Sequence, residues 1–469
     1  MLKSGKEFAP GIKRQDFPGN ISKIKPEQVL DYVVQRHAAH RRGLHYDLRI
    51  GNRPMGMFSW AANEPPTEID KDKQRVIRTN LHSSKYNDFE GEIPRPLYGA
   101  GFVSTHAKGK VLITHTTPNS IHYTLADKKH PVRYALVRPG QHFDKEWLLI
   151  KASLPEATGA EKPKYKSIPK EHLLEALKHL KPEDEVQPKV DGALHFVNIA
   201  RHKPEILSHR VSKTTGKPVL QTERFYGSVP HIDFPRELNN SVLLAEVYGE
   251  KNGKPIPNQA LSGLLNSSVG KALTDLKDRN ITLKGVLFDI AKKQNHPIDV
   301  NEMSYKERKA LLNQFMKYLP KGKFTVSEGT SDPKAAKKMV DQIASGKHPL
   351  TEEGVVIHKE HGAPQKYKLT EESDVYINGV FPAEKGSKYE NKGIGGFTYS
   401  LTPGGHTVGK IGTGLIDSLR HDAHKDPDKY IGRIAVIHSL GQFDKSKAHR
   451  NPALLRIHSD YDINNPPRD

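Results

Sequence analysis

The sequence contains no cysteine among its 469 residues. A chain without cysteine forms no disulfide, carries no thiol nucleophile and holds no zinc through sulfur ligands. It also has no apolar run near the roughly 20 residues of a membrane-spanning helix, and no signal-peptide core at its N-terminus. We therefore expect a soluble protein of a reducing compartment, in the cytoplasm, with no membrane partner.

Acidic residues are too few to balance the basic ones. The chain has 73 Lys and Arg against 54 Asp and Glu, which gives a formal net charge of +19. Such an excess favours a polyanionic partner, with nucleic acid ahead of an anionic membrane surface. A solvated basic surface without a specific partner would give the same counts. With 35% hydrophobic residues, the chain is polar for a globular protein but too apolar for a disordered one.

Composition divides the chain into five predicted parts. Short strands between Gly and Pro turns indicate a β-rich domain, in which Trp147-Leu148-Leu149-Ile150 is the expected closing strand. A stretch rich in Pro, Lys and Glu is typical of a linker. Dense glycine after Asp374 predicts a small β-barrel. The predicted parts are a basic arm at 1–30, a domain at 31–152, a linker at 153–170, an α+β domain at 171–372 and a barrel at 373–469.

Helical stretches are expected in the α+β domain, among them residues 302–318. A short amphipathic helix is expected at its start, with Leu173, Leu174, Leu177 and Leu180 on the predicted apolar face. Strands alternate with these helices, so the fold class is α+β with several domains.

The tetrapeptide Lys189-Val190-Asp191-Gly192 provides a candidate nucleophile. A nucleophilic lysine must lose its proton, which requires desolvation or nearby cations. Attack on an α-phosphate also needs a divalent metal and further cations for the developing charge. By chance, Lys-x-Asp-Gly would occur in about one in ten chains of this length.

Further segments with charged or aromatic side chains follow in order. Lys366 and Lys368 are two residues apart on a predicted strand, so both ammonium groups lie on one face. Taken singly, each residue could equally cap a strand or lie in the core. The series comprises Arg210 in Ser208–Lys213, Glu246 in Leu243–Gly249, Phe288 in Gly285–Ile290, Glu353 before Gly354–Ile357, and Lys366 and Lys368.

This series resembles the ordered motifs of ATP-dependent DNA ligases, in the superfamily that includes RNA ligases and mRNA capping enzymes. The resemblance covers about residues 165 to 469. It implies an ATP-grasp-like α+β nucleotidyltransferase domain followed by an OB-fold barrel, with ATP and Mg²⁺ or Mn²⁺ as cofactors. NAD-dependent ligases typically carry a four-cysteine zinc module, which this chain cannot build.

The resemblance also implies residue roles. Lys189 would form the adenylate, Arg210 would contact the ribose or the DNA end, and Glu246 would hold the ribose hydroxyl or a metal. Phe288 would stack on adenine, Glu353 would bind the catalytic metal, and Lys366 and Lys368 would grip the α-phosphate and the leaving group. The family usually has glutamate two residues before the lysine, where this chain has Gln187. The usual final Asp-Lys is replaced by Ser459-Asp460.

A histidine-rich run near the N-terminus forms a second constellation. His45, Asp47 and Arg49 share one face of a predicted strand, while Leu44, Tyr46, Leu48 and Ile50 share the other. Histidine and aspartate are good ligands for Mn²⁺ or Zn²⁺, and a neighbouring arginine can hold a phosphate. A polar strand face with satisfied histidines would give the same pattern.

The N-terminal domain, which we expect to be β-barrel-like, resembles the 3′-phosphoesterase domain of bacterial ligase D. The resemblance rests on the His-Tyr-Asp-x-Arg run, Phe58-Ser59-Trp60-Ala61, Asp88–Pro94 and Tyr98-Gly99-Ala100-Gly101. It implies that His37, His45 and Asp47 hold Mn²⁺, and that Arg49 and His82 engage the scissile phosphate with Tyr86 close by. The reaction would remove a terminal ribonucleotide or a 3′-phosphate and leave a 3′-hydroxyl.

The N-terminal resemblance has three departures. Two extra residues separate His37 from His45, so His40 competes as the metal ligand. Asn63-Glu64 stands where the family has a lysine. A shortened stretch before His82 makes Arg75 an ambiguous phosphate ligand.

Together, the two halves predict a DNA-repair ligase of non-homologous end joining. It would heal 3′ ends and then seal 5′-phosphate to 3′-hydroxyl through Lys189-AMP. The expected partner is nicked or broken duplex DNA, in the nucleoid, and the expected state is a monomer. Docking to Ku is left open, because the resemblance covers no polymerase module. The alternatives are an RNA ligase or other nucleotidyltransferase, and a DNA-end-binding scaffold with an inactive phosphoesterase domain.

Overall fold

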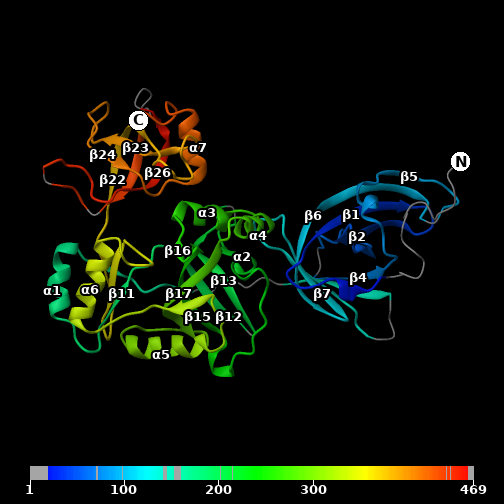
Figure 1. Ribbon diagram of the computed structural model, residues 1–469. Coiled ribbons are helices and arrows are strands. Elements are labelled where there is room, and N and C mark those ends of the chain that lie inside the picture. The colour runs from blue at the N-terminus through cyan, green and yellow to red at the C-terminus, as the bar shows by residue number, and fades with distance from the viewer. Residues whose placement is uncertain are drawn as a thin grey trace. The chain divides into compact units, whose positions relative to one another are not determined.

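The computed structural model describes residues 19–69, 72–97, 99–140, 145–152, 160–200, 202–213, 215–439, 441–443 and 445–462 (Figure 1). Most of the predicted arm, residues 153–159 of the predicted linker, Tyr98 and the side chains of Ser459-Asp460 lie outside the described residues. The chain forms two compact units. The first comprises 1–159, 196–240 and 264–281, and the second comprises 160–195, 241–263 and 282–469.

An antiparallel β-barrel dominates the first unit. Its strands follow the order β1-β2-β3-β4-β9-β8-β7-β6, with β5 at the edge of β6, and β1 pairs with β6 to close the barrel. The predicted strand at Trp147–Ile150 is confirmed within β9. The strands are β1 (Val29–Ala39), β2 (Gly43–Asn52), β3 (Gly56–Ala62), β4 (Lys73–Arg78), β5 (Gly91–Ile93), β6 (Gly101–Thr117), β7 (Ser120–Leu125), β8 (Arg133–Val137) and β9 (Glu146–Lys151), with 3-10 turns η2 (Ile21–Lys23) and η3 (Ser84–Asp88).

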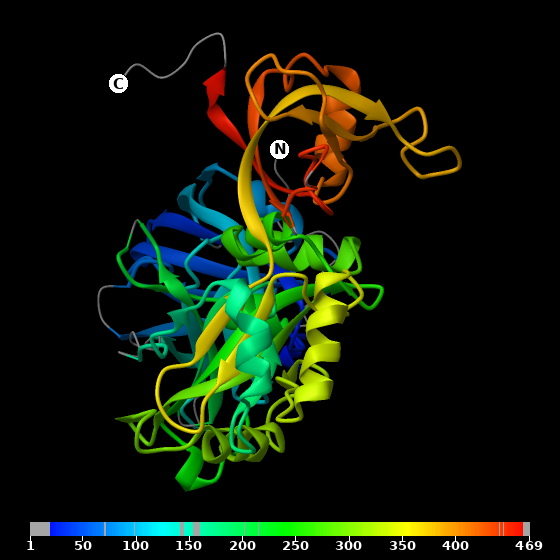
Figure 2. The same ribbon diagram turned by 90° about the vertical axis from the view of Figure 1, so that its left-hand side faces the viewer.

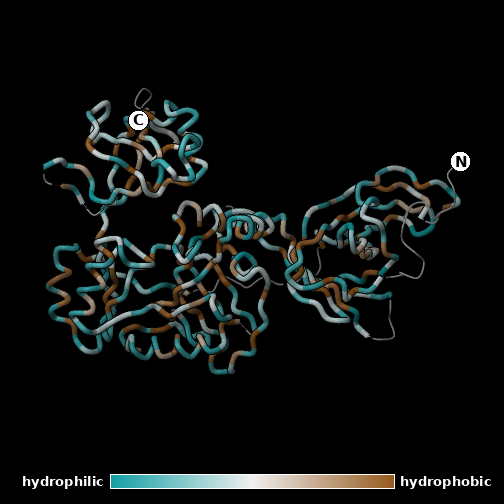
Figure 3. Tube along the Cα trace, in the orientation of Figure 1, coloured by the Kyte–Doolittle hydropathy of each residue, from teal (hydrophilic) through white to brown (hydrophobic). Residues whose placement is uncertain are grey.

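Alternating residues of β1 and β2 fill the barrel core. Tyr32, Val34, Leu48 and Ile50 are buried there, and hydrophobic positions recur along these strands (Figure 3). The predicted alternation is therefore confirmed along most of β2, because neighbouring strand residues point to opposite faces. Leu44 is the exception: it is 51% exposed, since it lies at the end of the strand beyond the core.

The same unit contains β13 (Lys203–Val211), β14 (Pro218–Leu220), α2 (Thr222–Tyr226), η5 (Arg236–Leu238), α4 (Val269–Asp278) and most of β12 (Ala193–Ala200). The Gly270 amide donates to the Ala126 carbonyl over 2.7 Å, and Val269 packs with Leu112 and Ala126. The barrel and these elements therefore share a packed contact.

Buried charges reinforce this contact. Arg133 of β8 donates to both Glu205 carboxylate oxygens, over 2.6 and 3.0 Å, and to Glu223 over 2.7 Å. Thr124 and Thr222 donate to Glu223 and Glu205, respectively. Glu205 is 4% and Glu223 0% exposed, so both carboxylates depend on these donors.

A four-stranded sheet opens the second unit, in the order β10-β21-β20-β11. Helices α1 and α6 pack together on one face, where Leu173, Leu177 and Val340 are buried (Figure 2). Leu174 was predicted on this apolar face, but it is 55% exposed because it points to the far side of a short helix. The elements are β10 (Lys166–Ser167), η4 (Lys170–His172), α1 (Leu173–Lys178), β11 (Glu185–Pro188), α6 (Pro333–Ala344), β20 (Gly354–His358) and β21 (Gln365–Lys368).

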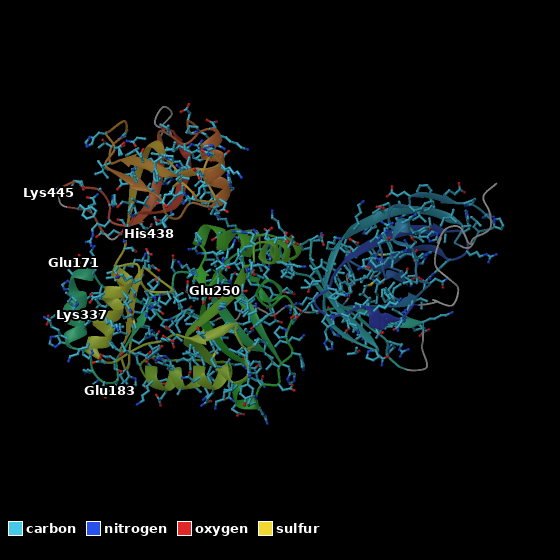
Figure 4. The ribbon with its side chains drawn as sticks, in the orientation of Figure 1. Glu171, Glu183, Glu250, Lys337, His438 and Lys445 are labelled. Atoms are coloured by element: carbon cyan, nitrogen blue, oxygen red, sulfur yellow. The ribbon has the colours of Figure 1, made fainter. Side chains whose placement is uncertain are left out.

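Two long antiparallel strands, β15 (Ser241–Lys251) and β17 (Thr282–Lys293), form the centre of the second unit. The predicted helical stretch at 302–318 contains α5 (Tyr305–Met316), which begins with a capping box between Ser304 and Glu307. Acidic and basic side chains, including Glu171, Glu183 and Lys337, are exposed on this unit (Figure 4). The remaining elements are β16 (Lys254–Pro255), α3 (Asn258–Asn266), β18 (His296–Pro297) and β19 (Phe324–Val326).

A five-stranded antiparallel sheet forms the C-terminal part, in the order β24-β23-β22-β25-β26. A parallel bridge between Thr413 and Ala453 brings the chain after β24 against β26, so the sheet curls round its core. The whole is thus α+β with several domains, as predicted. No helix among the described residues is long and apolar enough to cross a membrane. The elements are β22 (Glu371–Pro382), β23 (Ile394–Ser400), β24 (Gly409–Ile411), α7 (Asp417–Lys425), β25 (Arg433–Ser439) and β26 (Ala453–Asp462).

Candidate active sites

The outer face of β1 and β2 carries a compact cluster of metal-binding side chains. His37 and His45 lie directly opposite each other across the strand pair. The Asp47 carboxylate lies 3.6 Å from His37 Nδ1 and 3.8 Å from His45 Nε2. One ligand atom from each residue lies within 4.8 Å of the others, which places three donors around one point.

Backbone carbonyls orient both imidazole rings. His37 Nε2 lies 2.8 Å from the Gly99 carbonyl, and His45 Nδ1 lies 3.0 Å from the Gly43 carbonyl. Because a carbonyl only accepts, each of these nitrogens carries a hydrogen. His37 Nδ1 and His45 Nε2 are therefore the nitrogens that face Asp47, and in neutral rings they are the ones that would bind a metal, as in protein metal sites whose ligands are held by outer hydrogen bonds.

Arg49 and Gln35 extend the cluster beneath η3. Arg49 donates to the Gln35 side-chain oxygen, lies 3.4 Å from Asp47 and covers the Tyr86 ring at 4.7 Å. Gln35 in turn donates to the carbonyls of Tyr86 and Phe89, over 3.1 and 2.8 Å. Gln35 was not among the predicted site residues, although it lies two residues before His37 on the same strand face.

Burial and charge shift the titration of this cluster. Burial alone would raise the pKa of Asp47, but contact with His37 and the nearby Arg49 and His45 lower this pKa to about 2. Burial, together with Arg49, lowers the pKa of His82 to about 4, and the His82 and Tyr86 rings lie 5.8 Å apart. At neutral pH the cluster therefore contains a carboxylate, a guanidinium and a neutral His82.

The alternative candidates for the metal and phosphate ligands lie outside this cluster. His40 is exposed in the turn after β1 and is not among the described residues that could share a metal. Arg75 is exposed on β4 and pairs with Glu146. Asn63 and Glu64 are both exposed. The structure thus brings together His37, His45, Asp47, Arg49, His82 and Tyr86.

In the second unit, Lys189 lies in the loop after β11, and its backbone is held on both sides. Its amide donates to the Gly354 carbonyl over 2.8 Å, and Thr351 Oγ1 donates to its carbonyl over 2.5 Å. Lys189 Nζ donates to one oxygen of Glu353, and Lys368 Nζ lies 3.5 Å from the other. Glu353 therefore lies between two ammonium groups.

Gly192 allows strand β15 to approach this loop. A Cβ at this position would lie 2.5 Å from the Val247 carbonyl oxygen and 3.0 Å from Glu246 Cγ. Any side chain here would displace the strand that carries Glu246, because real Cβ contacts do not reach this distance. The glycine of the tetrapeptide thus has a steric role beside the lysine.

The charges around Lys189 are unbalanced. Burial raises the pKa of Glu246 to about 8, where Glu353 and Asp191 add to the shift and Lys189 opposes it. Burial and the neighbouring Lys189 and Lys368 lower the pKa of Lys366. Cations thus outnumber ionised carboxylates at neutral pH, as expected of a site that receives a polyanion.

The other predicted nucleotide contacts are placed as follows. Phe288 is partly exposed on β17, at the point where the pairing with β15 shifts register, and Val286 of the same strand lies opposite Glu246. Gln187 is buried, and its amide donates to Glu185 over 2.9 Å and to the Tyr305 hydroxyl. Arg210 is exposed on β13, in the first unit.

Family models match both parts of the chain. Residues 35–151 match the DNA Ligase D 3′-phosphoesterase domain, and residues 166–375 match the ATP dependent DNA ligase domain. The chain thus joins a domain of the ligase D 3′-phosphoesterase family to an ATP-dependent DNA ligase domain. Both resemblances noted in the sequence are thereby confirmed.

Two ligase D proteins are among the curated relatives, both described as multifunctional non-homologous end joining protein LigD. The Pseudomonas aeruginosa protein is 30% identical over 168 residues, which cover 33% of this chain and 20% of the relative. The Mycolicibacterium smegmatis protein is 32% identical over 128 residues, which cover 25% and 16%, respectively. The match thus spans a fifth or less of either relative.

Solved structures similar to this chain include DNA ligases. Mycobacterial DNA ligase D complexed with ATP and MES is 15% identical, with a TM-score of 0.35, over 61% of this chain and 92% of the other. Chlorella virus DNA ligase-adenylate is 16% identical, with a TM-score of 0.28, over 64% and 100%.

Proposed function

We propose that this chain is an ATP-dependent DNA ligase that seals 5′-phosphate to 3′-hydroxyl ends, with a metal-dependent 3′-phosphoesterase in its barrel. The substrate is nicked or broken duplex DNA, in repair by end joining. The observation that carries the ligase proposal is the contact of Lys189 Nζ with Glu353, beside Lys368. This arrangement brings Glu353 and Lys368, which are distant in the sequence, next to the lysine of the Lys-x-Asp-Gly motif.

The ligase chemistry begins at Lys189. Its ammonium group gives up a proton, to which the adjacent Glu353 carboxylate provides an acceptor. Lys368 and Lys366 place two further cations beside this lysine. Nζ then bonds to the α-phosphorus of ATP as the bond to the β-phosphate oxygen breaks, and pyrophosphate leaves. The same cations offset its charge.

The oxygen donors around Lys189, a site that we call the lysine centre, fit a hard divalent cation. Glu353 presents a carboxylate, and Glu246 presents a carboxyl group that a bound cation would ionise; both are oxygen donors of the kind that Mg²⁺ prefers. Such a cation would offset phosphate charge. We propose that Phe288 stacks on adenine and that Arg210 contacts the ribose or the DNA end. Both side chains are at least partly exposed, as these contacts require.

The barrel cluster fits a divalent metal through His37 Nδ1, His45 Nε2 and Asp47. Manganese suits this mixed set of nitrogen and oxygen donors and would polarise the terminal phosphate. Arg49 presents a cation to the same phosphate. His82 and Tyr86 complete the proposed site as neutral hydrogen-bonding groups.

We further propose that the chain from residue 373 onward forms an OB-fold and that the other domains keep their predicted limits, except that the linker ends before β10 at Lys166. The strand order, the position of α7 between β24 and β25, and the parallel Thr413–Ala453 bridge all support a five-stranded barrel of this kind. Arg456, on β26, is exposed and available to a phosphate. OB grooves bind nucleic acid without strong sequence preference, as a ligase requires.

Labelled ATP tests the ligase proposal. Wild-type protein incubated with Mg²⁺ and ATP labelled in the α-phosphate should acquire covalent AMP, and Lys189→Ala should acquire none. Lys337→Ala, at an exposed position on α6, is the matched control (Figure 4). Equal labelling of Lys189→Ala and the control would refute the assignment. Sealing of an all-RNA nick in preference to a DNA nick would favour an RNA ligase.

A 3′-phosphorylated oligonucleotide tests the barrel. Wild-type protein with Mn²⁺ should release inorganic phosphate, and His45→Ala should lose this activity. His40→Ala is the matched control, since His40 is a nearby but exposed histidine. No release by the wild type at any divalent metal would instead support a DNA-end-binding scaffold.

A further inference from the structure

Another cluster of metal-binding side chains lies in the first unit, away from the barrel cluster. His202 lies in the turn between β12 and β13, and His231 and Asp233 lie between α2 and η5. Asp233 Oδ1 lies 3.2 Å from His202 Nδ1 and 3.8 Å from His231 Nε2. The three donor atoms lie within 4.8 Å of one another.

The backbone holds the two segments together. The Ile232 amide donates to the His202 carbonyl over 2.7 Å, and the Asn240 amide donates to the Ile199 carbonyl over 2.6 Å. Phe234, next to Asp233, is buried. The Cα positions of the cluster are therefore fixed, while its exposed side chains can still adjust by small rotations. This arrangement lowers the ordering cost of binding a shared ligand.

The donor geometry matches a tetrahedral metal. Bond lengths of about 2.0–2.2 Å place two ligands of one zinc ion about 3.3–3.6 Å apart. The two distances to Asp233, 3.2 and 3.8 Å, lie close to that separation. The imidazole rings lie 5.1 Å apart and are inclined by 36°, so both can turn a nitrogen toward the carboxylate. A surface ion pair alone would contribute little stability.

We propose that His202, His231 and Asp233 bind a zinc-class divalent transition-metal ion, with water in the remaining position. Two imidazoles and a carboxylate are a donor set that Zn²⁺ accepts and that Mg²⁺ does not prefer. The ion fastens the segment after α2 to the β12–β13 turn. This structural site is independent of the proposed ligase and phosphoesterase reactions.

Titration of the whole chain with Zn²⁺ alone tests the site. Because the barrel cluster also offers His and Asp donors, the parent protein for the test is His45→Ala. Calorimetry, after removal of metal by a chelator and desalting, should show one equivalent fewer in His45→Ala/His231→Ala than in His45→Ala. The control His45→Ala/His179→Ala, which removes an exposed histidine on another element, should match the parent.

Thermal unfolding provides the second readout. A metal that binds only the folded state raises the melting temperature in proportion to ln(1 + [Zn²⁺]/Kd). Added Zn²⁺ should raise the melting temperature of His45→Ala more than that of His45→Ala/His231→Ala. His231 is exposed, so its removal should leave the metal-free melting temperature unchanged. Equal stoichiometry and equal shifts in the two proteins would overturn the proposal, whatever the outcome of the AMP-labelling and phosphate-release assays.

Discussion

The barrel centre, formed by His37, His45 and Asp47 with their neighbours, and the lysine centre around Lys189 are assembled in opposite ways. The metal-binding donors of the barrel centre come from two adjacent strands, between His37 and Asp47, and backbone carbonyls orient its rings. The lysine centre draws on residues from Lys189 to Lys368, which long-range pairing brings together. The first is local and rigid, whereas the second depends on the packing of its whole unit.

Their charges differ as well. Asp47 is ionised at neutral pH and already faces Arg49, so the barrel centre is prepared for a metal before a phosphate arrives. Around Lys189, burial keeps Glu246 largely protonated and leaves the ammonium groups in excess. We therefore expect the barrel centre to bind metal by itself, and the lysine centre to bind it mainly together with a nucleotide.

The largest predicted effect comes from Arg133→Ala. Its removal leaves the buried Glu205 and Glu223 without their cation, which should lower the free energy of unfolding by about 3–5 kcal/mol. Chemical denaturation monitored by tryptophan fluorescence measures this loss, since Trp60 and Trp147 both lie in the barrel. Under native conditions, metal binding at the barrel centre should survive, because its ligands are local.

Arg138→Ala is the control for that experiment, because Arg138 donates a hydrogen bond to the Asn119 side chain at an exposed position. Equal stability of the two variants would show that the buried ion cluster does not hold the unit together. Loss of barrel metal binding in folded Arg133→Ala would contradict the view that this centre is local.

The next effect is that of Gln35→Ala, which tests preorganisation in the barrel. Gln35 holds both Arg49 and the η3 backbone, so its loss should lower phosphate release by about 10–100-fold, as for other outer-shell residues of metal sites. Metal affinity should change less than the turnover rate, because Gln35 binds no metal donor directly. An unchanged rate would show that the position of Arg49 does not limit the reaction.

A smaller effect is expected from Lys162→Ala in the lysine centre. The charge of Lys162 lowers the pKa of both Glu246 and Lys366, so this lysine lies close enough to influence the phosphate site. Its loss should raise the KM for ATP in AMP labelling about fivefold, which corresponds to about 1 kcal/mol. Lys164→Ala, an exposed lysine of the same segment, should behave as wild type. Equal KM values for the two variants would show that Lys162 does not contribute to the ATP site.

The last predicted effect is a pH dependence of stability. The pKa of Glu246 rises from 4.5 to about 8 on folding, so the folded chain binds this proton more tightly than the unfolded chain. Its contribution to stability is therefore present below about pH 4.5 and is lost as the pH rises toward 8. The free energy of unfolding of Glu246→Gln should fall less between pH 5 and 8 than that of the wild type, as measured by denaturation at several pH values. Parallel curves for the two proteins would contradict the shifted pKa.

Local pattern was enough to find many of the site residues. A period of two places His45, Asp47 and Arg49 on one strand face, and it does the same for Lys366 and Lys368 on β21. These relations hold in any regular strand, because successive side chains alternate whatever the strand packs against. The motif around Lys189 similarly marks the lysine before any fold is known.

Tertiary structure decided which candidates meet. The β1–β2 register places His37, and not His40, opposite His45. It also brings Gln35 within hydrogen-bonding reach of Arg49. The predicted linker extended to residue 170, yet Lys166 and Ser167 pair with β21. Neither fact is visible in a local window, since register and edge pairing depend on contacts between distant segments.

By itself, then, the sequence determined the two motifs, the faces on which their side chains lie and the α+β class of the chain. Only the tertiary structure decided the third metal-binding donor, the closeness of Glu353 to Lys189 and the buried Arg133 cluster. The physical reason is the range of the interactions: alternation along a strand follows from backbone geometry, whereas charge pairing and steric fit arise only where folding joins separate strands.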